Sequence, residues 1–202
     1  GALSSSSLGN IQAGLDSYAK AARLREAVYQ ANKTDLEAKE KLANNYYVTA
    51  RTLWNDSRTQ EAEETFVRAL GLRRELAAEV PDSVEYQNRL AVLLIDYGAI
   101  PVFNSQTEKA VVLFNEAFSI IERLRSAEPN NPDLKKSQTR LLRVMSKAKG
   151  SLGDYEGAVS GFKLAIDISN DLARQFPADF RVQRSVWLTH SLVCELYIDK
   201  GD

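Results

Sequence analysis

The stretch SRTQEAEETFVRAL (57–70) has three relatives along the chain. They are GNIQAGLDSYAKAA (9–22), SQTEKAVVLFNEAF (105–118) and GDYEGAVSGFKLAI (153–166), and neighbouring copies are 48 residues apart with no insertion. A fixed period of this length is typical of a repeat protein, in which each repeat is one supersecondary unit. We therefore divide the chain into four units, at about 9–56, 57–104, 105–152 and 153–200.

Each unit contains two helical patterns separated by a short turn. The first pattern places a small residue, an aromatic residue and an alanine at i, i+4 and i+7, as Ala62, Phe66 and Ala69 do in the second unit. This spacing puts the three side chains on one face of an α-helix. Pro81 ends the pattern, and Ser83 can cap the start of a second helix. The equivalent capping residues of the other units are Asp35, Asn131 and Asp179. We expect helices over 11–32, 35–54, 59–80, 83–100, 107–128, 131–150, 155–176 and 179–199.

The fold class follows from these patterns. No segment alternates apolar and polar residues as a strand would, so the sequence predicts an all-α chain. One helix pair cannot bury its apolar stripe alone, whereas stacked pairs form the continuous core of an α-solenoid. The register also places a turn at Gly9–Asn10, which makes the first residues the end of an incomplete helix. We expect residues 1–202 to be a single solenoid domain cut from a longer protein.

Pro101 interrupts the pattern of the second unit. It falls at the end of the helix expected over 83–100. Proline lacks the backbone N–H and disfavours helical geometry in the residue before it, so the helix should end or kink at Ile100. Residues 101–106 should then form a loop, with the apolar side chains after the proline folded back onto the core.

Glycines cluster in the fourth unit, at Gly150, Gly153, Gly157 and Gly161. They do not form the G-x-x-x-x-G-K-[ST] loop that binds phosphates. Gly153 stands at the turn between two expected helices. Gly157 and Gly161 have no glycine counterpart in the other units, which indicates a place where a neighbouring helix packs closely.

The pattern A-x3-[FY]-x2-A and the turn Gly153–Asp154–Tyr155 resemble the tetratricopeptide repeat (TPR) family. The resemblance implies a right-handed superhelix with a concave groove that binds protein segments. The family repeat has about 34 residues, so both helices of this longer unit must be extended. The sequence LGNIQAGLDSYAKAARLREAV (8–28) is similar to the repeats of arrays found C-terminal to bacterial Ser/Thr protein kinases, although the chain carries no kinase motif.

The same resemblance implies that the second helix of each unit lines the groove. By register, the groove contacts are Asn44, Tyr47, Arg51, Val92, Ile95, Ala99, Arg140, Arg143, Lys147, Leu188, Ser191 and Glu195. The three basic residues in the third unit share one helix face. Because arginine pairs well with carboxylates, we hypothesise that the groove binds an acidic and apolar segment. The alternative is an ordinary solvated face.

Composition excludes several other functions. The formal net charge is −1, which gives no general attraction to nucleic acid. A single histidine, His190, and a single cysteine, Cys194, allow no intrachain disulfide and too few ligands for a zinc site built from these residue types. The two lie in positions that pack in the other units, so we expect a buried or half-buried structural pair. Their alternative role as a base and nucleophile has no substrate to support it.

The sequence therefore predicts a non-catalytic scaffold that binds a protein or peptide, without cofactor, metal, nucleic acid or membrane insertion. It could also be the regulatory region of a bacterial signalling kinase, and its units could associate end to end. A sensor domain that binds a small ligand in the groove is the main alternative. A cytoplasmic location is favoured unless a membrane helix precedes the segment.

Overall fold

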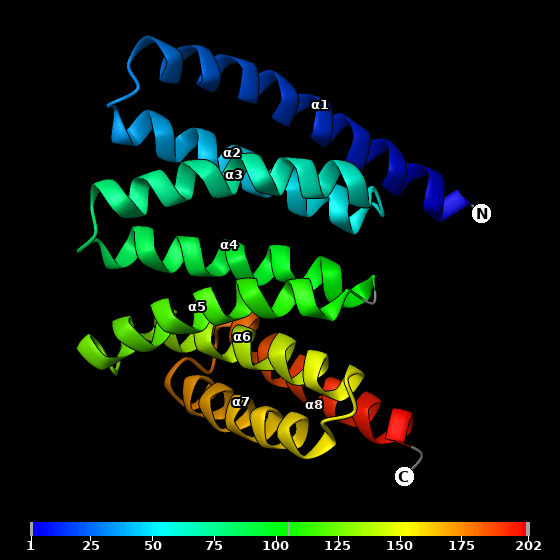
Figure 1. The fold of residues 1–202 in the computed structure, drawn as a ribbon. Helices are drawn as coiled ribbons and strands as arrows, with labels where there is room; N and C mark the ends of the chain where they lie inside the picture. The colour runs from blue at the N-terminus through cyan, green and yellow to red at the C-terminus, as the bar shows by residue number, and fades with distance from the viewer. Residues whose placement is uncertain (1, 105, 201–202) are drawn as a thin grey trace. The chain divides into compact units, whose positions relative to one another are not determined.

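The computed structural model describes the backbone of residues 2–104 and 106–200, and the side chains of residues 11–102, 104 and 106–198. All regular structure in these residues is α-helical (Figure 1). The helices are α1 (Ala2–Ala31), α2 (Leu36–Asn55), α3 (Thr59–Glu79), α4 (Val84–Phe103), α5 (Thr107–Ala127), α6 (Pro132–Ser151), α7 (Tyr155–Gln175) and α8 (Phe180–Lys200). The all-α class and the two helices expected in each repeat are confirmed.

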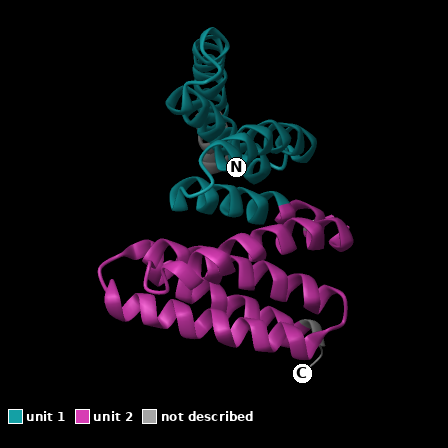
Figure 2. Cartoon of the chain, turned by 60° about the vertical axis from the view of Figure 1, so that its left-hand side comes forward, with its two compact units in different colours: residues 1–97 teal, residues 98–202 magenta. Residues whose placement is uncertain are grey.

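The chain divides into two compact units, Gly1–Tyr97 and Gly98–Asp202 (Figure 2). From here on, "unit" means one of these two parts, and each 48-residue segment is called a repeat. Unit 1 contains α1, α2, α3 and most of α4, and unit 2 contains the end of α4 and α5 to α8. Within unit 1, α2 packs on α1 and α3. Within unit 2, α6 packs on α5 and α7, and α8 packs on α7 and α6. Each unit therefore buries its own core by packing successive helices.

The repeated small–aromatic–alanine stripe is the centre of both cores. Phe66 is 1% exposed, and Ala62 and Ala69 on either side of it are completely buried. The equivalent residues of α5 and α7 have the same exposures: Ala110, Phe114 and Ala117, and Ala158, Phe162 and Ala165. Alanine removes the bulk that would hold two helices apart, and the phenylalanine fills the space between them.

Short polar side chains fix the starts of the second helices. Asp35 accepts hydrogen bonds from the backbone N–H groups of Glu37 and Ala38. Asn131 caps α6 in the same way, and Tyr86 N donates to Ser83 Oγ at 3.2 Å. These bonds satisfy N–H groups that have no partner within the helix. The capping column expected at 35, 83 and 131 is confirmed.

The glycines of the fourth repeat serve the backbone. Gly153 has φ +86°, a conformation that other residues rarely adopt, and so it forms the turn between α6 and α7. A Cβ added to Gly161 would lie 2.2 Å from Ser146 Oγ on α6. Gly161 therefore permits the close helix contact expected at this place. At Gly157, an added Cβ would instead meet the side chain of the capping residue Asp154, at 2.2 Å.

The prediction of a turn at Gly9–Asn10 was wrong. Helix α1 runs without interruption from Ala2 to Ala31. A glycine inside a helix costs only about 1 kcal/mol relative to alanine, which is too little to end a long helix by itself. The repeat register located the following helix pattern correctly but not the start of this helix.

The loop expected at 101–106 is shorter than predicted, because α4 continues through Pro101 to Phe103. Pro101 is buried, and the helix resumes its bonding after it, with Asn104 N donating to Ile100 O at 3.1 Å. A proline in the last turn removes one helical hydrogen bond but leaves few further turns to disrupt. Val102 is half-buried, whereas the side chain of Phe103 lies outside the described residues.

We expect Gly161→Ala to lower the free energy of unfolding by about 1–3 kcal/mol, because the new methyl group overpacks the α6–α7 contact. Ser146→Ala removes the oxygen that it meets, so the double variant should recover most of the loss. Chemical denaturation monitored by circular dichroism measures both effects.

The matched control is Gly71→Ala on α3, where an added Cβ meets no atom within 4 Å. This change should stabilise the helix by about 0.5–1 kcal/mol. If Gly161→Ala stabilised the protein as much as Gly71→Ala, the close contact would be refuted.

Candidate functional site

The predicted groove residues lie on the second helix of each repeat, and we describe them separately in the two units. We call the surface of α2 and the unit 1 part of α4 around Tyr47 the unit 1 face. We call the surface of α6 and α8 around Lys147 the unit 2 face. Each face combines side chains from two helices that are 48 residues apart in register.

The unit 1 face is organised by an aspartate. Tyr47 Oη donates a hydrogen bond of 2.7 Å to Asp96 Oδ2. Arg51 Nε lies 3.5 Å from the same oxygen, and the Arg51 guanidinium lies 5.6 Å from the centre of the Tyr47 ring. Tyr47 and Arg51 were predicted here, but Asp96 was missed because it stands one position after the groove column. Asn44, also predicted, is exposed.

Not all of the predicted contacts on α4 are available to a ligand. Ile95 is completely buried, so it belongs to the core and the expectation that it contacts a ligand was wrong. Burial of its apolar side chain is favourable, and the groove column turns inward at this residue. Val92 and Ala99 are half-buried, with Ala99 in the part of α4 that belongs to unit 2.

The basic residues of the unit 2 face contact α8. Arg143 Nη1 donates to Ser185 Oγ at 2.9 Å and to the Ser185 carbonyl at 3.2 Å. Lys147 Nζ pairs with Glu195 Oε2 at 3.5 Å. These side chains therefore join two helices of the fold as well as facing solvent, which the sequence did not predict. Arg140, Leu188 and Ser191 are half-buried in the same surface.

A cavity of about 200 Å³ opens beside the pair of Lys147 and Glu195. The apolar residues Phe162, Leu192 and Leu196 line it, together with Tyr155, Gly150 and Ser151. It is smaller than the roughly 300–1,000 Å³ of typical small-molecule sites. The cavity has an apolar lining and one charge of each sign at its rim, which suits an apolar side chain flanked by polar groups.

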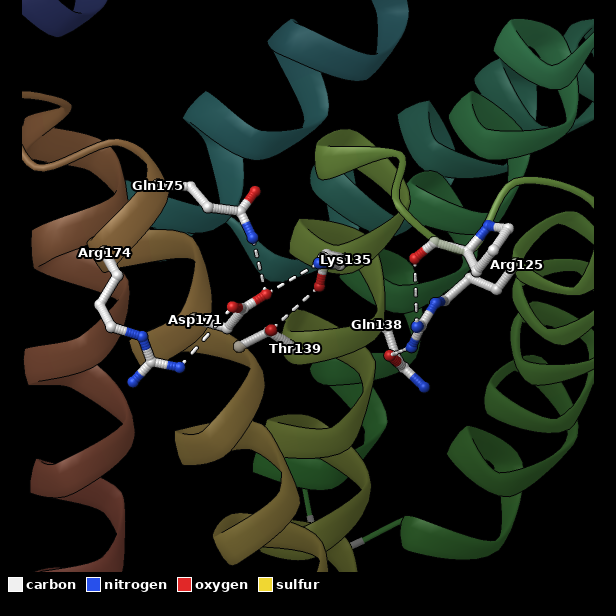
Figure 3. A network of polar contacts seen from close by, with 8 residues as sticks. Arg125, Lys135, Gln138, Thr139, Asp171, Arg174 and Gln175 are labelled. Atoms are coloured by element: carbon white, nitrogen blue, oxygen red, sulfur yellow. Dashed lines mark hydrogen bonds and ion pairs between the residues drawn. The ribbon is translucent and has the colours of Figure 1, made fainter.

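A second group of polar contacts joins α6 to α7 (Figure 3). Lys135 Nζ donates to Asp171 Oδ2 at 2.8 Å, and Gln175 Nε2 donates to the same oxygen at 2.8 Å. The hydrogen bond from Lys135 and then that from Gln175 lower the pKa of the Asp171 carboxyl. On the other side of α6, Arg125 of α5 bonds to Gln138. This network holds three helices together.

Unit 1 contains the same lysine–acid contact in a more buried form. Lys39 is 2% exposed, pairs with Glu75 Oε2 at 3.1 Å and also contacts Glu79. Burial alone would lower the pKa of Lys39, but the hydrogen bonds to Glu79 and Glu75 outweigh it and raise the pKa. Lys39 and Lys135 are 96 residues apart, as are Glu75 and Asp171. The contact is therefore a repeated structural element.

Glutamine replaces this lysine in the second helices of the other two repeats, α4 and α8. Gln87 donates to the carbonyl of Pro81 at 3.2 Å, and Gln183 donates to that of Pro177 at 3.3 Å. A lysine reaches forward to the next helix, whereas a glutamine reaches back to the preceding turn. Lysine and glutamine alternate at this position along the sequence, with a period of 96 residues. The search for a 48-residue period did not detect this alternation.

His190 and Cys194 do not form the buried or half-buried pair that the sequence predicted. Both are exposed on α8, because no described helix covers the face on which they lie. Neither residue lines any of the cavities given above. Among the described residues, no group of three or more histidine, cysteine or acidic side chains could hold a metal ion, and no helix is long and apolar enough to span a membrane.

The fold defines the class of this chain, which is an all-α helical repeat protein. No protein-family model matches the sequence, and no curated protein matches it. Among solved structures, a de novo designed helical repeat protein is similar over 96% of this chain and 99% of its own. The identity is 14% and the TM-score is 0.35, so the class rests on the chain's own helices and not on this similarity.

We expect Asp171→Asn to destabilise the protein at neutral pH by removing the charge that Lys135 binds. Since the pKa of Asp171 is lowered on folding, its contribution is present above the ordinary carboxyl pKa of about 3.9 and is lost as the pH falls through the lowered value. The stability difference from the parent should therefore shrink below about pH 4. Urea denaturation from pH 7 to pH 3 measures it.

Asp167→Asn provides the control, because Asp167 is exposed one turn earlier on α7. It should change stability little across the range. A difference between Asp171→Asn and the parent that stayed constant to pH 3 would contradict the ion-pair account.

Proposed function

We propose that this chain is a protein-interaction scaffold that binds a segment of another protein on the unit 2 face. One observation carries the proposal: the cavity is lined by Lys147 and Glu195, two residues that the resemblance to the TPR family assigns to a groove. Helical repeats commonly present such surfaces for binding. A pocket for one apolar side chain with charges at its rim resembles the anchor sites of peptide ligands.

The chemistry of the face favours an acidic and apolar segment. Arg140, Arg143 and Lys147 outnumber Glu195 on it. An apolar side chain of the ligand would enter the cavity, and a carboxylate next to it would accept a hydrogen bond from Lys147 in place of Glu195. Arg143 would remain bound to Ser185 and would contribute its charge without changing partner.

The finer identity that we propose is a TPR array of the long type. The stripe of Ala158, Phe162 and Ala165 and the turn at Gly153 support it, since both have the chemistry of that repeat. We further propose that the array belongs to a bacterial signalling protein with a Ser/Thr kinase. The similarity of residues 8–28 to kinase-associated arrays is the support for this context.

Peptide display on the 202-residue chain tests the proposed function. Selected peptides should be acidic with an apolar anchor, and Lys147→Ala should weaken their binding at least about fivefold, the loss expected for one charge-assisted hydrogen bond. Leu192→Asp places an unpaired charge in the cavity and should weaken binding further. Fluorescence anisotropy with labelled peptides measures the affinities, and circular dichroism checks that the variants fold.

Lys163→Ala is the matched control, because Lys163 is an exposed lysine on α7 outside the unit 2 face. Its affinity should equal that of the parent. Peptides that bound equally well to Lys147→Ala and Leu192→Asp would overturn the assignment of the site.

A small-ligand sensor is the second candidate, and a second cavity, which shares Tyr155 and Leu196 with the first, favours it. This cavity measures about 440 Å³ and is lined by residues of α7 and α8: Tyr155, Glu156, Val159, Ser160, Lys163, Leu196 and Tyr197. Its size falls within the range of small-molecule sites. Thermal stabilisation by a metabolite, reduced by Lys163→Ala and not by Lys147→Ala, would favour this function over peptide binding.

A further inference from the structure

One face of α8 is exposed although the equivalent face is buried elsewhere. On α2, the residues Lys39, Ala43, Tyr46, Ala50 and Leu53 are all buried. Helix α2 packs on both α1 and α3, and Lys39 pairs with Glu75 of α3. The residues of α8 at the same repeat positions are all exposed, and we call them the α8 open face: Gln183, Trp187, His190, Cys194 and Tyr197. Trp187 is 66% exposed where Ala43 is completely buried.

A face of α1 is open in the complementary way. On α3, the residues Ala62, Ala69, Leu72 and Leu76 are all buried. The residues of α1 at the same positions form what we call the α1 open face: Gly14, Ala21, Leu24 and Val28. Leu24 is 71% exposed and Val28 is 56% exposed, whereas Leu72 and Leu76 are 9% and 1% exposed. Gly14 and Ala21, nearer the N-terminus of α1, are half-buried, so Leu24 and Val28 carry most of the exposed apolar surface of this face.

Within the chain, these two kinds of face pack against each other. Helix α2 packs on α3, and Tyr46 of the first face and Leu72 of the second line the same surface hollow. Helix α6 packs on α7, with Ser146 lying against Gly161. The α8 open face is equivalent to the faces of α2 and α6, and the α1 open face to those of α3 and α7. The two open faces are thus the two halves of an interface that the chain forms internally.

We propose that the chain binds a second copy of itself head to tail, with the α8 open face of one copy on the α1 open face of the next. The contact is heterologous, so each copy keeps one free face and further copies can add. Burial of exposed Trp187, Leu24 and Val28 supplies the hydrophobic gain. The net charge of −1 offers little repulsion between copies.

The internal register predicts which residues meet. Position 194 is equivalent to Ser146, and position 17 is equivalent to Gly161, so Cys194 of one copy should lie against Ser17 of the next. Because the paired helices are antiparallel, Trp187 should lie near Leu24. Because a tryptophan stands where the internal interfaces have Ala43 or Thr139, the two helices are held further apart there than inside the chain.

Sedimentation of the 202-residue chain over a concentration series tests the association. The average mass should rise with concentration, and Trp187→Asp or Val28→Asp should each weaken association at least about tenfold, because each places an unpaired carboxylate in the interface. Leu164→Asp changes an exposed leucine of α7 that belongs to neither open face and should have no effect. A chain that stays monomeric at all concentrations overturns the proposal and leaves these faces to another helix.

Mixing the Trp187→Asp and Val28→Asp variants distinguishes head-to-tail association from association through two like faces. Trp187→Asp retains an intact α1 open face, and Val28→Asp retains an intact α8 open face. The mixture should form heterodimers with the affinity of the parent interface, and nothing larger. If the mixture does not associate while the parent does, the head-to-tail contact is wrong. If one variant alone dimerises as strongly as the parent, the association joins like faces, which also contradicts the proposal.

A cross-link checks the register independently. Under oxidising conditions, Ser17→Cys should form disulfides between the new thiol of one copy and Cys194 of the next, giving ladders of dimers, trimers and longer species on a non-reducing gel. Ser17→Cys combined with Cys194→Ser should lose these ladders. Efficient dimers of the parent through Cys194 alone would show that two α8 faces meet, which contradicts the proposal.

Discussion

The fold depends on how closely two helices can approach at an alanine. In three repeats a completely buried alanine stands on each side of a phenylalanine that is 1% exposed. If the alanines were larger, the neighbouring helix would be displaced and the ring would lose its contacts on both sides. Gly161 takes the same constraint further, because its contact with Ser146 leaves no room for a methyl group. The remaining contacts, polar and apolar, are formed at the separation that these residues set.

The polar contacts determine how neighbouring helices are aligned along their length, and they contribute little to the free energy of unfolding. Lys39 and Lys135 each bind an acidic residue of the following helix. Asp171 is about 38% exposed, and ion pairs so close to water are worth little by themselves. A lysine that must reach one particular carboxylate nevertheless favours one sliding position of the two helices over its neighbours. The close-packed alanines and the ion pairs therefore constrain different degrees of freedom of the same helix contact.

Periodicity predicted the fold well because it depends on residues that packing restricts. The stripe through Phe66 and the capping residues Asp35 and Asn131 occur where the sequence placed them. The errors arose where a rule for isolated residues was applied inside a stable helix, as at Gly9 and Pro101. The site was harder to predict, because a repeat position does not determine exposure. Ile95 and Tyr47 occupy the same position of successive repeats, yet Ile95 is buried and Tyr47 binds Asp96.

The alternation of lysine and glutamine has a consequence for how such an array can grow or shrink. Removing residues 57–104 would keep the 48-residue period, but it would bring Arg123 to the position of Glu75 and set two cations against each other at Lys39. Removing residues 57–152 would bring Asp171 there and preserve the pair. The module that duplication or recombination can exchange without penalty is therefore a block of two repeats, and viable relatives of this array should differ in length by 96 residues more readily than by 48.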